Sequence, residues 1–437
     1  MQIKYSTIYG YHIWDVLNAI SSRKDIAYNT KERMIKDYEK LKEKYKEDYG
    51  EEKIKLGSLL KDKNIIIIQL ESMQRFVTNK KINGKEITPN LNRFLKENIE
   101  LTNMHMQSYS TTADSEHSVI NSLYPVENGM AYSKYYKNKY DNLYKIFNNA
   151  GYYTSYMHGN IGKFWNRANV YKSMNINDLV FLDKFDDYEY VSSYLSDEAL
   201  YLQAVDKLDN YKNPFISYIV AASSHTPFEL WGLEDRNKIS IDVGEYKDTN
   251  FGKYLEAVNY ADYTFGLFIN KLKEKGLYDN TAILIFGDHN GISMYEEEML
   301  DFFDKAGIKM TDAEIQLNYT NVVSGLKLPG VKNKKITKPV SKLDIKPTIS
   351  YLCGIEDGFS LGTNIFENKD FVCTNNERII TTDYYYDGEK WFYINSGEII
   401  DFEKSNTDLL KLLDNYYQNM KTELNISNSI VINNLLK

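Results

Sequence analysis

The run SYSTTADSEHS, residues 108–118, places hydroxyl side chains directly before acids and a histidine. Two adjacent threonines, Thr111 and Thr112, stand among serines, and the run contains neither proline nor glycine. One interpretation is a helix N-terminus, where a threonine or serine caps the first turn and acids follow. The other is that one hydroxyl acts as a nucleophile. The run alone leaves both interpretations open.

Five further polar residues each lie at or just after a stretch that is typical of a strand. They are Glu71, His158, His225, Asp288 and His289. Taken singly, each has an ordinary interpretation as a cap, a loop histidine or a turn. Parallel sheets, however, hold their ligands beyond the carboxyl ends of the strands. Because all five residues fall at such ends, the sequence predicts that they share one edge of one sheet.

Three of these residues could hold a metal ion. Glu71, Asp288 and His289 offer two carboxylates and one imidazole, and a hydroxyl from the SYSTTADSEHS run would complete the set. Oxygen donors with one nitrogen suit Mn²⁺ or Mg²⁺, with Zn²⁺ as a further option. A hydroxyl beside such an ion loses its proton more readily and can attack at neutral pH. Since the chain has only six histidines, we expect one metal rather than two or three.

The stretch GNIGKFWNR, residues 159–167, adds a second group of candidates. The guanidinium of Arg167 could bind two oxygens of a phosphate, and the indole of Trp165 could supply a flat wall with one donor. His225 could hydrogen-bond a phosphate or a hydroxyl and move a proton. An equally acceptable interpretation is a helix start with a surface arginine, a packed tryptophan and a loop histidine.

Helical and apolar stretches alternate along the part of the chain that must position these residues. The pattern covers residues 63–72, 88–99, 140–160, 196–228 and 254–291. Alternation of this kind predicts βαβ units and therefore an α/β fold with a central, mostly parallel mixed sheet flanked by helices. We expect this α/β catalytic domain to span residues 58–372.

The sequence patterns at the two ends of the chain differ from those of the central part. Residues 1–57 form a helical connector, whose charged stretch 31–55 predicts a solvated helix. Residues 373–437 predict a small α+β subdomain, with antiparallel hairpins turning at DG and SG and a helix from NTDLL onward.

Composition excludes several classes of protein. Hydrophobic residues make up 43% of the 437 residues, enough for a sizeable core, and the net charge of -8 argues against nucleic-acid binding. Two cysteines, Cys353 and Cys373, make no disulfide framework. The longest apolar run, NIIIIQL, is far shorter than the ~20 residues of a membrane helix, and no signal peptide opens the chain.

The sequence resembles the catalytic ectodomain of the lipoteichoic acid synthases. The resemblance is carried by a series of motifs in this order: LES, TTADSE, SLYP, HGN with FWNR, SSHTPF and FGDHNG. The lipoteichoic acid synthases are phosphoglycerol transferases of Gram-positive bacteria, within the alkaline phosphatase/sulfatase superfamily. The resemblance implies that Thr112, rather than Thr111, is the nucleophile. It also implies metal ligation by Glu71, Thr112, Asp288 and His289, with Mn²⁺ as the usual ion and Mg²⁺ as the alternative.

The resemblance also implies a substrate pocket. Trp165, Arg167 and His225 would contact the substrate, with Arg167 and His225 taking part in catalysis. His158 and Asn160 would line the same pocket. The acids of the D-S-E motif, at 114 and 116, are expected to cap and hold the helix that carries Thr112.

The implied reaction uses phosphatidylglycerol or a similar phospholipid as donor. Thr112 attacks the phosphodiester, diacylglycerol leaves, and a glycolipid or teichoic acid hydroxyl then accepts the phosphoglyceryl group, which polymerises or primes lipoteichoic acid. The expected partners are these lipids and the membrane surface. Members of the family carry several amino-terminal membrane helices, so we expect an excised domain from the extracellular face of the membrane, either anchored in the full protein or released.

Other functions stay open at this point. The approach SYST before Thr112 differs from the glycine- and lysine-containing approach of the family. A related transferase that moves a sugar phosphate or phosphoethanolamine onto a cell-envelope acceptor is therefore the alternative. A catalytically silent ectodomain that binds polymer or lipid is disfavoured by the intact metal-ligand set. Sulfatase activity is disfavoured because no Cys or Ser stands in a C/S-x-P-x-R context.

Overall fold

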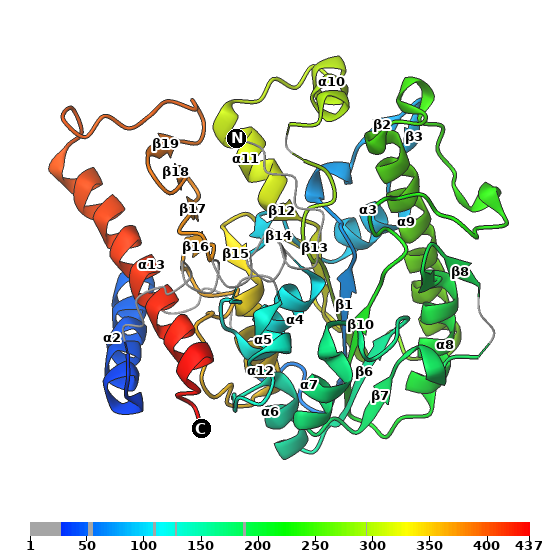
Figure 1. Ribbon diagram of the computed structural model, residues 1–437, viewed down its shortest axis with the longest axis horizontal. Coiled ribbons are helices and arrows are strands. Elements are labelled where there is room, and N and C mark those ends of the chain that lie inside the picture. The colour runs from blue at the N-terminus through cyan, green and yellow to red at the C-terminus, as the bar shows by residue number, and fades with distance from the viewer. Residues whose placement is uncertain (1–27, 51–55, 108–110, 127–128, 187–188, 294) are drawn as a thin grey trace, which may run out of the picture.

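The computed structural model is shown in Figure 1. The residues that it describes are 28–50, 56–107, 111–126, 129–186, 189–293 and 295–437. Residues 1–27 and 51–55 of the predicted connector, and residues 108–110 of the hydroxyl-rich run, therefore lie outside the described residues. None of the described helices is both long enough and apolar enough to cross a membrane.

A mixed, mostly parallel sheet forms the centre of the molecule. In the described part of the chain it has eight strands in the order β14-β4-β13-β11-β1-β10-β6-β7. Their bounds are β1 Asn64–Leu70, β4 Ile99–Leu101, β6 Tyr153–His158, β7 Asp178–Val180, β10 Phe215–Val220, β11 Thr281–Gly287, β13 Ser324–Lys327 and β14 Lys334–Ile336. Strand β1 runs parallel to β10 and β11, whereas β13 is antiparallel to β11 and β4. The predicted fold class is thus confirmed.

Strand β1 shows why this segment lies at the centre. All seven of its residues are buried, and β-branched isoleucine suits an extended backbone. Successive side chains point to opposite faces of a strand. Ile66 and Ile68 accordingly pack into one hydrophobic cluster, and Ile65 and Ile67 into another on the opposite face. A continuous apolar run therefore predicts a strand with helices on both sides.

Helices cover both faces of the sheet (Figure 1). On one face lie α3 Pro89–Glu97, α8 Asp197–Asp209 and α9 Asn250–Glu274. On the other lie α4 Thr112–Asn121, α6 Leu143–Asn149, α7 Arg167–Ser173 and α12 Ile345–Cys353. Further helices are α5 Met130–Ser133, α10 Glu297–Lys305 and α11 Asp312–Thr320. The helices predicted within 88–99, 140–160, 196–228 and 254–291 are all present.

Smaller sheets surround this core. A separate antiparallel sheet near the carboxyl end contains β16 Phe371–Cys373, β17 Ile379–Thr381, β18 Tyr384–Tyr386 and β19 Trp391–Tyr393. A three-stranded sheet contains β5 Met104–His105, β12 Asn321–Val322 and β15 Val340–Ser341. Two hairpins are β2 Lys81–Ile82 with β3 Lys85–Glu86, and β8 Tyr190–Val191 with β9 Tyr194–Leu195. The predicted carboxy-terminal hairpins are thus present.

The charged stretch after residue 30 forms a helix that is mostly accessible to solvent, as predicted, but one side of it is buried. Helix α2, Lys31–Tyr49, buries Met34, Leu41 and Tyr45. These residues recur at intervals of seven and four, which places them on one side of a helix. That side packs against α13, Thr407–Asn433, although the two helices are far apart in sequence (Figure 1).

One buried carboxylate joins these distant segments. Glu423 of α13 accepts hydrogen bonds from Tyr45 Oη at 2.6 Å, Tyr124 Oη at 2.5 Å and Lys369 Nζ at 2.7 Å. Burial raises the pKa of Glu423, but the charge of Lys369 outweighs that effect and leaves it below its usual value. Since Tyr124 follows the end of α4, this cluster fixes α2 and α13 to the segment behind the hydroxyl-rich run.

We expect Glu423→Ala to lower the free energy of unfolding by about 3–5 kcal/mol, because it leaves the buried Lys369 charge without a partner. Urea denaturation followed by circular dichroism measures this change. Glu403→Ala, at an exposed position in the same part of the chain, is the control and should change stability by less than about 0.5 kcal/mol. Equal losses in the two variants would contradict this account of Glu423.

Candidate active site

The residues predicted at strand ends do meet at one edge of the central sheet. Glu71 directly follows β1, His158 is the last residue of β6, and Asp288 and His289 directly follow β11. His225 lies in the loop beyond β10. Because these four strands are parallel, their carboxyl ends open on the same side of the sheet.

The two threonines of the hydroxyl-rich run have different partners. Thr111 is the N-cap of α4, and its Oγ1 accepts a hydrogen bond from the backbone N–H of Asp114 at 3.1 Å. Thr112 is the first residue of the helix, and its Oγ1 donates to Glu71 Oε2 at 3.3 Å. The capping interpretation therefore holds for Thr111, while Thr112 directs its hydroxyl into the predicted site.

Three side chains predicted as metal ligands converge beside Thr112. His289 Nε2 lies 3.5 Å from Glu71 Oε1 and 3.4 Å from Asp288 Oδ2. One ligand atom from each of the three residues falls within 4.8 Å of the others. Glu71 and Asp288 are almost completely buried, and the His289 side chain is 16% exposed. Two carboxylates and one imidazole thus lie close enough together to hold one ion, and the Thr112 hydroxyl is hydrogen-bonded to one of the carboxylates.

Neighbouring groups hold the three ligands in place. The Nδ1–H of His289 donates to the backbone carbonyl oxygen of Asn290 at 2.9 Å, which leaves Nε2 as the nitrogen with a free lone pair. The Oδ1 atom of Asp288 accepts from the backbone N–H groups of Ser72 at 2.8 Å and His289 at 2.7 Å, so Oδ2 faces the cluster. Ser72 Oγ also donates to Glu71 Oε1 at 2.7 Å.

Two supporting residues escaped sequence reasoning. Gln69 donates from Nε2 to the carbonyl oxygen of Thr112 at 3.2 Å, and Tyr218 Oη donates to Gln69 Oε1 at 2.5 Å. Lys342 is buried and donates from Nζ to the carbonyl oxygen of Asp288. Gln69 stands inside an apolar strand, and Lys342 lies far from any motif, so no sequence signal marks either residue.

Charge crowding makes the cluster suited to a cation. Burial, reinforced by the Asp288 carboxylate, raises the pKa of Glu71 to about 7. Burial lowers the pKa of His289, but the Asp288 and Glu71 carboxylates overcome that effect and leave it above its usual value. Both shifts have one cause, the cost of holding negative charges together away from water, and a divalent cation relieves that cost.

The donor set passes a geometric test for one divalent ion. Ligands bound at about 2.1 Å lie roughly 3–4 Å apart around an octahedral ion. The distances from His289 Nε2 to Asp288 Oδ2, 3.4 Å, and to Glu71 Oε1, 3.5 Å, fall in that range, and so does the 3.3 Å from Thr112 Oγ1 to the other Glu71 oxygen, Oε2. The residues that would hold the ion are Glu71, Thr112, Asp288 and His289, the set that the sequence predicted.

Arg167 forms a buried ion pair that the sequence did not predict. Its Nε and Nη2 atoms both donate to Glu116 Oε1, at 2.9 and 2.6 Å, and both side chains are buried. Glu116 therefore does not cap α4, as the sequence suggested, but holds the arginine. The Nη1 atom of Arg167 is buried and has no hydrogen-bond partner, so its two N–H groups are available to a ligand.

The two histidines beyond β6 and β10 have defined tautomers when neutral. His158 Nδ1 donates to the carbonyl oxygen of Val220 at 3.0 Å, and His225 Nδ1 donates to that of Thr226 at 2.6 Å. Burial, aided by the Arg167 charge, lowers the pKa of His158 to about 3, so this ring stays neutral. Its Nε2 is then a hydrogen-bond acceptor, which suits a hydroxyl better than a phosphate.

Trp165 packs tightly against Gly129, the N-cap of α5. A Cβ atom at Gly129, whose φ is +69°, would lie 2.6 Å from Cζ3 of the Trp165 ring, so only glycine fits there. The N–H of Gly129 in turn donates to Asp114 Oδ1 at 3.0 Å. Asn160 Oδ1 accepts from the N–H of Ile161 at 2.7 Å, which stabilises the loop after β6.

A profile of the family described as Sulfatase matches residues 63–355, which is well over half of the chain. The chain belongs to the sulfatase family. The matched segment includes β1, α4 and β11, the elements that carry all four predicted metal ligands.

Individual relatives show which members of the sulfatase family this chain resembles. It is 32% identical over 429 residues to the lipoteichoic acid synthase of Staphylococcus aureus strain USA300, and the match covers 94% of this chain. The match spans 65% of that relative's length, slightly less than two thirds. The resemblance predicted from the motifs is therefore confirmed.

Solved structures agree with this assignment. The lipoteichoic acid synthase LtaP from Listeria monocytogenes superimposes with a TM-score of 0.79 at 28% identity, covering 90% of this chain and 98% of that one. A protein of the alkaline phosphatase superfamily from Vibrio parahaemolyticus superimposes with a TM-score of 0.68 at 18% identity, covering 86% of this chain and 88% of that one. The second likeness shows the fold alone.

In this sulfatase-family chain, Tyr194 of β9 is a further site residue that sequence reasoning missed. Its ring lies 5.3 Å from that of His225. Burial and the Glu71 carboxylate raise the pKa of Tyr194, while the charge of Arg167 lowers it. Tyr194 is thus within electrostatic reach of both the metal-ligand cluster and the arginine. The short hairpin around it contains no motif that could have marked it.

We expect the affinity for Mn²⁺ to rise with pH between about 6 and 8. The pKa of Glu71 is about 7, so below pH 7 the ion must displace a proton from Glu71 to bind. Displacing one proton makes the affinity for Mn²⁺ fall roughly tenfold for each pH unit below 7. Isothermal titration calorimetry at several pH values measures this slope.

Glu71→Gln should abolish Mn²⁺ uptake, whereas Glu356→Gln, at an exposed position, should titrate like the wild type. If Glu71→Gln bound Mn²⁺ as tightly as wild type, the assigned ligand set would be wrong.

Proposed function

We propose that this chain is the catalytic part of a metal-dependent phosphoglycerol transferase that primes or polymerises lipoteichoic acid. The observation that carries the proposal is the Thr112 hydroxyl, held 3.3 Å from Glu71 inside the cluster of Glu71, Asp288 and His289. Its likeness to lipoteichoic acid synthases supports the same reaction. The proposed donor is phosphatidylglycerol, and the acceptor is the hydroxyl of a glycolipid or of a growing teichoic acid.

The proposed reaction has two displacements at phosphorus. In the first, Thr112 Oγ1 bonds to the phosphorus of the donor, the bond from phosphorus to the diacylglycerol oxygen breaks, and the threonine proton is passed on to that leaving oxygen. In the second, an acceptor hydroxyl attacks the phosphoglyceryl-threonine. The bond to Thr112 then breaks, and the threonine regains a proton. Each step exchanges one P–O bond for another, so no oxidant or further reactant is needed.

The cation, which we propose to be Mn²⁺ with Mg²⁺ as the alternative, would lower the pKa of the Thr112 hydroxyl and offset charge on the phosphoryl oxygens. The residues of the chain supply the rest. Nη1 of Arg167 would donate to a phosphoryl oxygen, and His158 Nε2 would accept from a glycerol hydroxyl. His225, in the half-buried loop beyond β10, would move the proton of the leaving or attacking oxygen. Trp165 and Asn160 would line the pocket around the glycerol.

Incubation with Mn²⁺ and phosphatidylglycerol vesicles, without an acceptor, should leave a phosphoglyceryl adduct on Thr112 that mass spectrometry of peptides detects. Thr112→Ala should form no adduct, because no hydroxyl remains beside Glu71. Thr111→Ala is the matched control: it should still form the adduct, while losing about 0.5–2 kcal/mol of stability with its cap.

Two results would change the proposal. An adduct in Thr112→Ala would disprove the assignment of the nucleophile. An adduct that formed only with a phosphoethanolamine or sugar-phosphate donor would reassign the substrate while keeping the mechanism.

Exposed aromatic side chains near the site support contact with a membrane surface. Trp231 is 59% exposed and Tyr190 is 42% exposed. The two loops are joined, because the N–H of Ser192 donates to the carbonyl oxygen of Trp231 at 2.6 Å. The hairpin that carries Tyr190 also carries Tyr194 beside His225. Tryptophan and tyrosine favour the interface between lipid and water, where the proposed donor lies.

We therefore expect Trp231→Ser to reduce transfer from lipid vesicles while leaving the Thr112 site intact. Binding to phosphatidylglycerol vesicles, measured by co-sedimentation, should weaken by on the order of tenfold with loss of an interfacial anchor. The matched control is Phe402→Ser, which removes a similarly exposed ring, 51% accessible, near the carboxy-terminal sheet. Equal binding by the two variants would argue against this docking face.

A further inference from the structure

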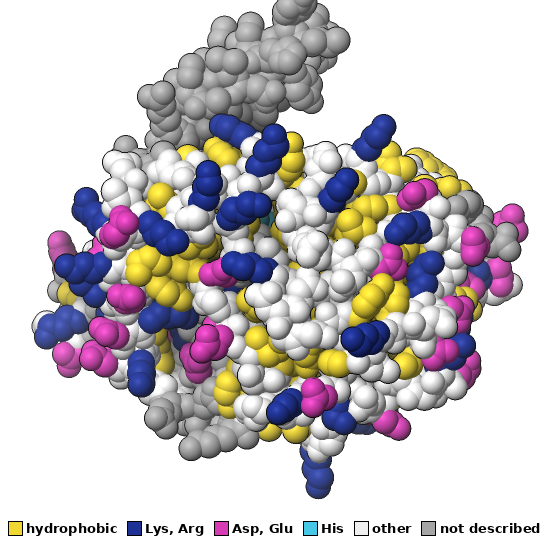
Figure 2. Space-filling model, turned by 90° about the horizontal axis from the view of Figure 1, so that it is seen from below, with side chains coloured by type: hydrophobic (Ala, Val, Ile, Leu, Met, Phe, Trp, Pro, Cys, Tyr) yellow, Lys and Arg dark blue, Asp and Glu magenta, His cyan; other side chains and the backbone are white. Residues whose placement is uncertain are grey.

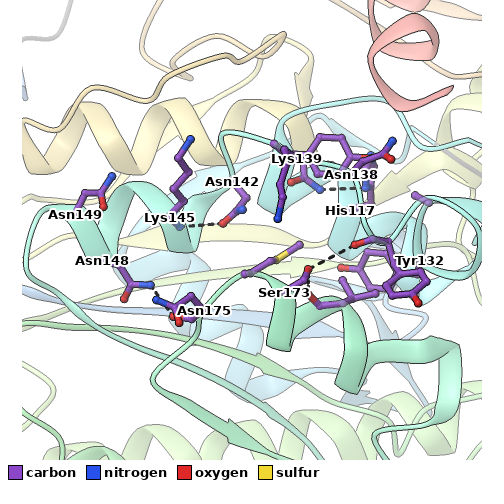
Figure 3. Close-up of a pocket in the computed structure, with 16 residues that line it drawn as sticks. His117, Tyr132, Asn138, Lys139, Asn142, Lys145, Asn148, Asn149, Ser173 and Asn175 are labelled. Carbon is purple, nitrogen blue, oxygen red and sulfur yellow. Dashed lines mark hydrogen bonds between the residues drawn. The ribbon is translucent and has the colours of Figure 1, made fainter. Parts of the chain in front are cut away.

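A cavity of about 330 Å³ lies on the other side of α4 from the predicted active site. Its walls come from α4, α5, α6 and α7 and from the segment between α5 and α6. Figure 3 shows His117 and Tyr132 at one end, and Asn148 and Asn175 at the other. The volume is at the lower end of the range of roughly 300–1,000 Å³ that small-molecule sites occupy. The cavity therefore has room for a ligand about the size of one sugar.

Helix geometry separates this cavity from the nucleophile. His117 follows Thr112 by five residues on α4. At about 100° per residue, the two side chains leave the helix roughly 140° apart. A molecule in the cavity would therefore contact the back of the nucleophile helix without occupying the catalytic site.

Besides Tyr140, whose Oη has no partner, two buried side chains in the cavity wall each keep one polar atom without a partner. His117 is 1% exposed and its Nε2 makes no hydrogen bond, and Asn121 is 2% exposed and its Oδ1 makes none. The two side chains do bond to each other, since Asn121 Nδ2 donates to His117 Nδ1 at 3.0 Å. Unpaired buried polar atoms are costly, so a ligand that gave these two atoms a hydrogen-bond partner would be stabilised.

The pair offers one donor and one acceptor. Because His117 Nδ1 accepts from Asn121, the proton of the neutral ring is on Nε2, which then donates, while Asn121 Oδ1 accepts. If the amide of Asn121 were turned over, Nδ2 would donate and His117 Nε2 would accept. In both orientations the pair presents one hydrogen-bond donor and one acceptor. Burial lowers the pKa of His117 to about 3, so the ring stays neutral.

A hydroxyl group matches this pattern, because it both donates and accepts, whereas a phosphate only accepts. The rest of the wall is also suited to a polyhydroxy compound, with several asparagine side chains and the aromatic rings of Tyr132, Tyr136 and Tyr140.

Helices α6 and α7 lie at the bottom of Figure 1, and Figure 2 looks onto that side. Lysine and arginine side chains are spread across this face among acidic and hydrophobic ones.

We propose that this cavity is a binding site for a polyol, which places a hydroxyl between His117 and Asn121. The polyol could come from a glycerol unit or from a sugar, and both share the hydroxyl chemistry that the site selects. The inference goes beyond the proposed transfer reaction and does not depend on it.

Saturation-transfer NMR with the full chain tests the site, using glycerol, glycerol 1-phosphate and methyl glucoside as separate probes. We expect transfer to at least one of them. A signal from glycerol or its phosphate would identify the glycerol unit as the source, and a signal from the glucoside would identify a sugar.

Ser173→Phe closes the cavity at an exposed wall position, and should remove the signal without disturbing the core. Lys172→Phe, at the exposed neighbouring position outside the cavity wall, is the matched control and should keep it. His117→Phe retains an aromatic ring but lacks the polar atom, and should weaken binding by on the order of tenfold. Melting temperatures would show that each variant is folded.

Three results would overturn the proposal. The first is the absence of transfer to every probe, which would mean that only water fills the cavity. The second is an equal signal in Ser173→Phe and Lys172→Phe. The third is a signal that survives Ser173→Phe but is lost in Arg167→Ala, which would place the probe in the catalytic site instead.

Discussion

The site depends on holding two carboxylates and an imidazole a few ångströms apart and away from water. Glu71 and Asp288 belong to segments more than 200 residues apart in sequence, and they meet because β1 and β11 are neighbours in the sheet. Alone, this arrangement is unfavourable, which is why the pKa of Glu71 rises to about 7. The backbone N–H groups that bind Asp288 and the carbonyl that orients His289 hold it in place. Such a site favours a divalent cation and keeps the hydroxyl of Thr112 next to it.

A second buried charge pair performs a different task. Glu116 lies on α4, as Thr112 does, and its carboxylate binds Arg167 at the start of α7. Breaking a buried pair leaves an uncompensated charge, so this contact couples α4 to the loop that contains Trp165. The arginine is thereby held in place, and its Nη1 is buried without a hydrogen-bond partner. Rigid positioning of this kind reduces the entropy lost when a phosphate binds.

Much of the fold could be predicted from local patterns. The apolar run before Glu71 and the alternation of helical and apolar stretches indicated a mostly parallel sheet between helices, and the DG and SG turns indicated hairpins. Local patterns did not show that α2 is buried on one side, because a charge-rich helix can still carry an apolar side, formed here by Met34, Leu41 and Tyr45. They also misassigned Glu116, since an acid near a helix start looks like a cap whether or not an arginine from another helix binds it.

The sequence by itself determined which residues could do chemistry: the motifs around Glu71, Thr112 and Asp288 indicated the donor types, and strand ends placed them at one edge. Only the tertiary structure decided which donors meet and which partners hold them. Gln69, Tyr194 and Lys342 reach the site through strand order and loop packing, which leave no signal in the local sequence. The same holds for the cavity behind α4. The physical reason is that hydrogen bonds and charge interactions act over a few ångströms in space, whereas sequence patterns record only neighbours along the chain.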